Sequence, residues 1–353
     1  GLMQLVAYGA QDIYLTGNPQ ITFFKVVYRR HTNFSMESIQ QTLDGTVSKS
    51  ASTVTATIAR NGDLLSNLYL DVKFAACTTA DGTTYANWAN NTGHSYIKEV
   101  DLEIGGQRID RHYGSWLDIY NELTDHQESE HVMLNKHQSR DAYLKGCVLT
   151  NTGGELNSSS HFTSKGATKG HRQTLQLNVP LKFWFCRNPG LALPLIALQY
   201  HEVKVKLSLR GVMGLVHSDK GDTIAAADPS VKLWADYVYL DTDERRRFAQ
   251  VSHEYLIEQL QHQTDTASNS VKLNFNHPVK ELVWVFQDTT ANSEGTAAAD
   301  VLGSGSSNLG NYAGALSGAG NDYLNYSPNA PTNAEWVNGQ RSLEGFSTAL
   351  LQL

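Results

Sequence analysis

Side chains that can bind a divalent metal gather in one polar segment of the sequence. The cluster comprises His126, Glu128, Glu130, His131 and His137. His126 and Glu130 would share one face of a helix, because residues four apart lie one above the other. The spacing matches neither the His-Glu-X-X-His nor the His-X-His pattern of metalloenzymes. A solvated connection therefore explains the cluster better than a metal centre does.

The usual motifs of catalysis and nucleotide binding do not occur in the sequence. It has no Gly-X-Ser-X-Gly elbow, no phosphate-binding loop and no Gly-X-Gly-X-X-Gly turn. His201-Glu202 and His253-Glu254 lack a second histidine four residues on, so we interpret both as polar ends of strands. We predict no catalytic residue, no metal and no cofactor, and a protein that is not an enzyme.

Two basic clusters occupy the same place in two similar stretches, Tyr14–Ile39 and Tyr239–Gln261. Each stretch runs from a turn through basic residues and an aromatic to an alternating strand, which indicates a duplicated unit. The net charge of -7 argues against a nucleic-acid coat. We therefore expect the clusters to pair with acidic residues of a neighbouring subunit. They comprise Arg29 and Arg30 in the first stretch and Arg245, Arg246 and Arg247 in the second.

Period-2 alternation dominates the chain and predicts an all-β protein. The longest apolar file runs from Leu175 to Phe185, with Pro180 on its opposite face, as is typical of an edge strand. A short helix is expected after Ser115, with Trp116, Leu117, Tyr120 and Leu123 on one stripe. The pattern predicts a double jelly roll, two tandem antiparallel eight-stranded β-sandwich barrels with short inserted helices and cores filled by aliphatic and aromatic side chains.

We expect four segments: an N-terminal arm (1–24), a first jelly roll (25–211), a Gly/Asp/Ala-rich linker (212–228) and a second jelly roll (229–353). The second jelly roll carries a long loop (288–340) that we expect to be exposed. In the internal alignment, the end of the chain matches the strand around Leu102. The second barrel is therefore expected to be incomplete in this chain.

Composition indicates a globular protein made in a reducing cytoplasm. Of 353 residues, 41% are hydrophobic and 18% charged, and the three cysteines are far apart. No apolar run reaches the ~18 residues needed to span a bilayer, and no signal peptide is visible, so membrane insertion is not expected. Asn-X-Ser/Thr sequons begin at Asn33, Asn90, Asn157 and Asn325.

The stretch Gly9–Lys25 closely resembles the N-terminal signature of major capsid proteins of large nucleocytoplasmic double-stranded-DNA viruses, above all the algal chlorella-virus type. Four further stretches, spread over about the first three quarters of the chain, resemble the same family. They are Leu102–Asp110, Pro189–Val203, Trp234–Tyr237 and His253–Gln259.

The resemblance implies a structural role in the virion. It implies a double jelly roll that trimerises into pseudo-hexagonal capsomers, which tile an icosahedral shell around an internal membrane. The implied partners are itself as a homotrimer, neighbouring capsomers and minor capsid proteins, with no direct contact to nucleic acid. It also implies a late glycoprotein assembled in the host cytoplasm. Since viral enzymes of this group modify asparagines outside the usual sequon, Asn292 joins Asn325, Asn157 and Asn90 as a candidate.

Two alternatives remain open at this point. One is a minor capsid or spike paralogue with the same fold. The other is a carbohydrate-binding or metal-dependent jelly-roll protein, which the histidine cluster and the aromatics of the 288–340 loop motivate.

Overall fold

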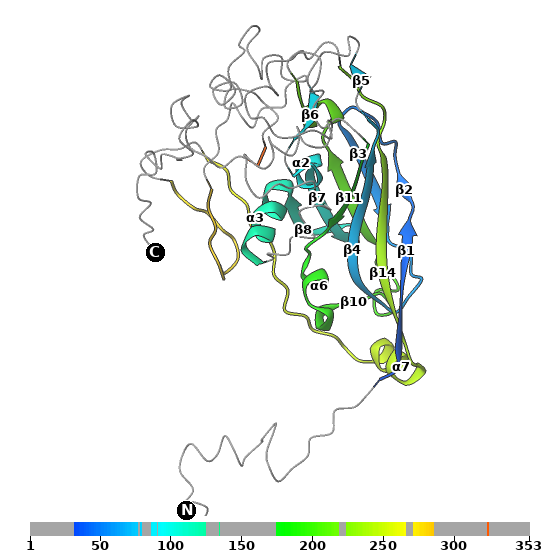
Figure 1. The fold of residues 1–353 in the computed structure, drawn as a ribbon. Coiled ribbons are helices and arrows are strands. Elements are labelled where there is room, and N and C mark those ends of the chain that lie inside the picture. The colour runs from blue at the N-terminus through cyan, green and yellow to red at the C-terminus, as the bar shows by residue number, and fades with distance from the viewer. Residues whose placement is uncertain are drawn as a thin grey trace, which may run out of the picture.

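The structure, a computed structural model, describes residues 32–76, 78–79, 86–89, 91–124, 134, 174–218, 224–265, 271–285 and 323–324. Two five-stranded antiparallel sheets stack face to face (Figure 1). Sheet A contains, in spatial order, β1 (Phe34–Gln41), β14 (Ser230–Leu240), β4 (Leu64–Phe74) and β10 (Leu193–Pro194), with β9 (Leu175–Pro180) also paired to β4. Sheet B contains β2 (Leu43–Asp44), β3 (Ser52–Thr57), β11 (Val203–Leu209), β7 (Ile97–Ile104) and β8 (Gln107–Tyr113).

The long strands of the two sheets follow jelly-roll topology. Taken in chain order they are β1, β3, β4, β7, β8, β9, β11 and β14. If these eight strands are numbered 1 to 8 along the chain, their spatial order is 1, 8, 3, 6 in sheet A and 2, 7, 4, 5 in sheet B. Strands that follow one another thus often lie in opposite sheets, as in a double-sheet jelly roll. The predicted antiparallel sandwich is confirmed for this part of the chain.

Strand β14 corrects the predicted domain boundary. We expected residues 212–228 to be a linker and residue 229 to start the second unit. Instead β14 lies between β1 and β4, pairing Tyr237 with Glu37 on one side and Leu233 with Leu70 on the other. Val212, Leu215 and Val216 are buried in the core. The described parts of this segment, 212–218 and 224–228, therefore belong to the first sandwich, whose last strand ends at Leu240.

The core lies between the two sheets, because the inward positions of each strand are apolar. In β4 these positions are Leu68, Leu70, Val72 and Phe74, all at most 1% exposed. Phe74 packs its ring against Trp88 and, edge to face, against Tyr96, with centroids 5.2 and 5.0 Å apart. Sheet B contributes Val54, Ala56, Val100, Leu102, Val205 and Leu207.

Short helices and strands fill the connections. The helices are α2 (Thr92–Tyr96), α3 (Gly114–Thr124), α6 (Trp184–Arg187) and α7 (Thr242–Gln250), with 3-10 turns η1 (Pro189–Leu191) and η2 (Val212–Leu215). The short strands β5 (Thr78–Thr79) and β6 (Ala86–Trp88) pair with β13 (Ile224–Ala225) and β12 (Val216–Ser218).

Two helices differ from the sequence-based expectation. In α3 the buried side chains are Leu117, Asp118 and Asn121, whereas Leu123 is exposed, because Asp118 accepts a hydrogen bond from Asn91 Nδ2 at 2.7 Å and turns that polar face inward. The apolar file from Leu175 to Phe185 is a strand only as far as Pro180. Phe183 is the N-cap of α6 and Phe185 lies in its single turn, and both side chains are still buried.

The 288–340 loop, which we expected to be exposed, contains one residue that is buried, Tyr323. This residue is 3% exposed, and the guanidinium of Arg210 lies 4.0 Å from the centre of its ring. Arg210 Nη1 also donates to the carbonyl oxygens of Ser95 and Ile97. Tyr323 is therefore packed into the core of the first sandwich.

Within the residues that the structure describes, no helix has both the length and the apolar character needed to cross a bilayer.

Candidate subunit-contact surface

Helix α7 carries the second predicted arginine cluster at one end of the sandwich, next to the start of β1 (Figure 1). Its N-cap is Asp241, whose Oδ1 accepts from the backbone N–H of Thr242 at 2.7 Å. Asp243 and Glu244 in the first turn and Arg247 in the last turn both suit the helix dipole. None of the residues of α7 is buried, and Asp243, Arg246 and Arg247 are exposed.

Arg245 holds α7 to the sandwich through Asp63, the residue just before β4. The Nε of Arg245 donates to Asp63 Oδ1 at 2.7 Å, and the backbone N–H of Leu240 donates to Oδ2 at 2.9 Å. Asp63 is 3% exposed. Arg245 therefore has an acidic partner within its own chain, while a contact of this cluster with a neighbouring subunit stays a prediction.

We expect Asp63→Ala to lower the free energy of unfolding by about 2 kcal/mol, because it removes two hydrogen bonds to a buried carboxylate. It should also loosen α7, so trypsin should cleave after Arg245–Arg247 several times faster than in the unmodified chain. Urea unfolding and timed proteolysis measure the two effects. Asp71→Ala, on β4 itself and half-buried, is the matched control and should change stability by less than about 0.5 kcal/mol. Equal effects of the two substitutions would contradict the anchoring role.

Three further charged residues of α7 lie on a different face of the helix from Arg245. Arg246 and Arg247 are exposed, as is Asp243, and these three residues share one helix face because they are three and four positions apart. No ion pair joins them to any residue that the structure describes. Arg29 and Arg30, the corresponding cluster of the first stretch, lie outside the described residues.

Exposed apolar side chains lie at the same end of the molecule. Phe34 and Met36 are 64% and 54% exposed. They sit on β1, opposite Leu240 and Val238 of β14, and among the described strands β1 is an edge strand that pairs with β14 alone. Its single charged residue is Glu37. Long edge strands without lysine or proline readily pair or pack with another chain.

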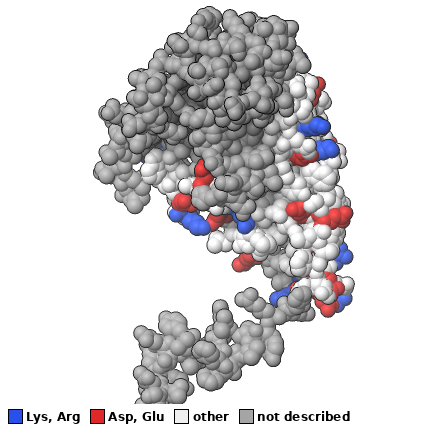
Figure 2. Space-filling view, viewed as in Figure 1, with Lys and Arg blue, Asp and Glu red and all other residues white. Residues whose placement is uncertain are grey.

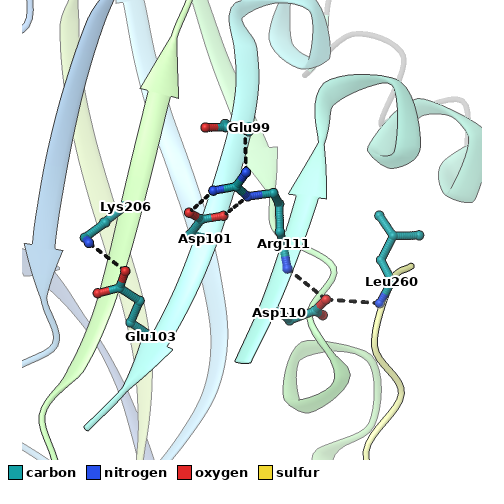
Figure 3. A network of polar contacts seen from close by, with 7 residues as sticks. All are labelled: Glu99, Asp101, Glu103, Asp110, Arg111, Lys206 and Leu260. Carbon is teal, nitrogen blue, oxygen red and sulfur yellow. Dashed lines mark hydrogen bonds and ion pairs between the residues drawn. The ribbon is translucent and has the colours of Figure 1, made fainter. Parts of the chain in front are cut away.

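The outer face of sheet B has the opposite character, since its charges pair with one another (Figure 3). Arg111 on β8 donates from Nη2 to Asp101 Oδ2 at 2.6 Å and lies 3.3 Å from Glu99 Oε2. The hydrogen bond with Asp101 raises the pKa of Arg111 above its usual value. Lys206 on β11 pairs with Glu103 at 2.6 Å. These cross-strand pairs leave little unbalanced charge for a partner.

The chain that follows α7 crosses the open edge of β8. Leu260 N–H donates to Asp110 Oδ1 at 3.1 Å (Figure 3), and Gln259 Nε2 donates to the carbonyl oxygen of Ile109 at 2.6 Å. Asp110 is buried and also lies 2.9 Å from Nε2 of the buried His112. This edge of sheet B is therefore covered by the chain itself.

The remaining predicted sites fall outside the described residues. These are the four asparagine candidates Asn90, Asn157, Asn292 and Asn325, and the cluster of His126, Glu128, Glu130, His131 and His137. Among the side chains that the structure does describe, no group of three or more His, Cys, Asp or Glu could hold a metal ion.

Two family models match adjoining parts of the chain. The model for the major capsid protein N-terminus matches residues 22–241, and that for the large eukaryotic DNA virus major capsid protein matches residues 244–347. The boundary between the two matches falls directly after β14, which agrees with the corrected end of the first sandwich.

Relatives of known identity are viral capsid proteins. The chain is 53% identical over 292 residues to the major capsid protein of Pyramimonas orientalis virus and 44% identical over 331 residues to that of Paramecium bursaria Chlorella virus 1. These matches cover 81% and 91% of this chain, which spans 64% and 65% of the relatives' own lengths. A solved capsid of PBCV-1 aligns with a TM-score of 0.49 at 38% identity, covering 73% of this chain and 57% of that one. With its first family match extending over the whole described sandwich, this chain belongs to the major capsid proteins of large eukaryotic DNA viruses.

Proposed function

We propose that the chain is a structural subunit of an icosahedral virion shell. Family membership at 44 to 53% identity carries this proposal. The described jelly roll supports it physically, because its core is filled by side chains and its long strands offer broad, flat outer faces. We propose a structural role and no enzymatic one, as the family of capsid proteins suggests.

We further propose that the complete protein is a double jelly roll that forms a homotrimer. The repeated stretch Tyr239–Gln261 and the second family match at 244–347 support a second unit after the first. Three chains with two similar lobes each present six lobes around one axis, so a single protein can tile a hexagonal lattice. The trimers would then contact neighbouring capsomers and minor capsid proteins, in a shell that surrounds an internal membrane. Glycans on Asn90, Asn157, Asn292 and Asn325 remain predictions of the sequence.

Light scattering coupled to size-exclusion chromatography tests this proposal on the complete protein. We expect a species with three times the mass of one complete chain, and a pseudo-hexagonal outline in negative-stain images. A stable monomer that binds one metal ion per chain would instead favour the metal-dependent alternative. A minor capsid role would be favoured if mass spectrometry of purified particles found the protein at low abundance.

A further inference from the structure

We infer that α7 forms a contact between two copies of this chain, in which each helix lies antiparallel to the other. The inference rests on the proposed shell function and adds to it the surface through which one capsomer meets the next. The contact comprises the exposed face of α7 with Asp243, Arg246 and Arg247, flanked by Phe34 and Met36 of β1.

The charge order along α7 is complementary to itself. Asp243 and Glu244 form an acidic first turn, and Arg246 and Arg247 follow one turn later. If two copies of such a helix pack antiparallel, the acidic turn of each lies against the basic turn of the other. A parallel arrangement would place like charges together, which is unfavourable. The order of the charges therefore favours a second copy of the chain as the partner, and an antiparallel orientation of the two helices.

The helix is also short and has no buried residue to stabilise it. It has nine residues, none of them buried, and isolated helices of that length are marginal in water. Within the described residues, its anchors are the N-cap Asp241, the pair of Arg245 with Asp63 and the stacking of Phe248 on His253, whose ring centroids are 5.1 Å apart. None of these three contacts involves Asp243, Arg246 or Arg247, so a partner helix could dock on that face without displacing them.

Apolar area for the contact comes from the neighbouring edge strand. Phe34 lies opposite Leu240, one residue before the cap of α7, so both features occupy one end of the sandwich. Figure 2 shows acidic and basic side chains adjacent to one another at the end of the molecule where Figure 1 places α7. Phe, Met and Arg are all enriched at protein–protein interfaces relative to the rest of the surface.

Antiparallel packing of identical helices requires a two-fold axis. The contact is therefore distinct from the three-fold contacts inside the proposed trimer, and it joins chains of two different capsomers. This distinction allows the two proposals to be tested separately.

A charge-swap experiment tests the inference on the full chain. The acidic variant carries Arg246→Glu and Arg247→Glu, and the basic variant carries Asp243→Arg and Glu244→Arg; Asp241 and Arg245 stay unchanged because they hold the helix. Sedimentation velocity measures association of trimers at low salt. We expect each variant alone to associate at least about tenfold more weakly than the unmodified chain, because like charges then face each other. Mixing acidic with basic trimers should restore association to within about threefold.

The matched control is the variant with Lys73→Glu and Lys232→Glu, which changes the net charge as much as the acidic variant does. Both lysines are exposed at the opposite end of sheet A, close to Ser230, so association should be unchanged. Phe34→Ser should weaken association in a way that added salt does not alter.

Variants that associate like the unmodified chain would overturn the inference, as would a mixture that stays as weak as its components. Trimers that form but show no further association would also overturn it and leave the proposed function intact. A chain that stays monomeric would contradict the proposed function and this inference together.

Discussion

Gly114→Ala should destabilise the first sandwich by about 3 kcal/mol or more. Gly114 begins α3, where this helix packs against α2 and the start of β7. A Cβ atom at this position would lie 2.3 Å from the carbonyl oxygens of both His94 and Ile97. Both are backbone atoms of packed elements, so neither can rotate away as a flexible side chain would. The helix must shift, and its buried residue Leu117 must shift with it.

Urea unfolding followed by tryptophan fluorescence measures this effect. Gly106→Ala provides the comparison, because Gly106 has φ of +81° but no atom within 4 Å of the added Cβ. That substitution introduces backbone strain without a clash and should cost about 1 kcal/mol. Two variants of equal stability would mean that the contact at Gly114 does not limit packing.

The second large effect concerns Tyr237, whose hydroxyl is enclosed between β14, β1 and the chain before β4. The hydroxyl donates to the carbonyl oxygen of Ala59 at 2.6 Å and lies 3.1 Å from Gln41 Oε1. Burial raises the pKa of Tyr237 to about 12. The unfolded chain therefore loses this proton near pH 10, while the folded chain keeps it up to about pH 12.

The sign of the pH dependence follows from these two values. Between pH 10 and 12 the folded state binds more protons than the unfolded state, so the free energy of unfolding falls as pH rises. The contribution of Tyr237 is full below pH 10, and about 2 to 3 kcal/mol is lost by pH 12.

Comparison with Tyr237→Phe isolates this residue from other groups that titrate in the same range, including Tyr96, whose pKa burial also raises. At neutral pH we expect the variant to be about 1 to 2 kcal/mol less stable, because Ala59 and Gln41 each lose a hydrogen-bonding contact with the hydroxyl. From pH 10 to 12 its stability should fall less than that of the unmodified chain. Parallel slopes in urea titrations at each pH would show that the phenol of Tyr237 is not responsible.

Much of the first sandwich could be predicted from alternation alone. The outward polar and inward apolar positions of β4, β7 and β11 follow the two-residue period of a strand with one buried face. The unit boundary could not be predicted in this way. A Gly/Asp/Ala-rich connection looks the same whether it joins two domains or two strands, and only the pairing of β14 with β1 and β4 decides between them.

The site was predictable in part. Similar basic clusters in two stretches led to Arg245, Arg246 and Arg247. Their sequence could not reveal that Arg245 pairs with Asp63, since that carboxylate is 182 residues away. Asp63, Asp110 and Tyr323 were all missed. Each is an isolated polar or aromatic residue whose burial depends on a distant segment, and local periodicity contains no signal for such a contact.

The position of β14 has a consequence for biosynthesis. Glu37 of β1 and Tyr239 of β14 touch through a hydrogen bond of 3.2 Å, yet they are 202 residues apart in the chain. At ordinary translation speeds roughly 10 to 40 s pass between the emergence of the two strands from the ribosome. During that interval β1 lacks β14, the strand with which it pairs in the described part of the chain. Molecular chaperones that shield a growing polypeptide are therefore most needed in this window, before the last strand arrives to close the sheet.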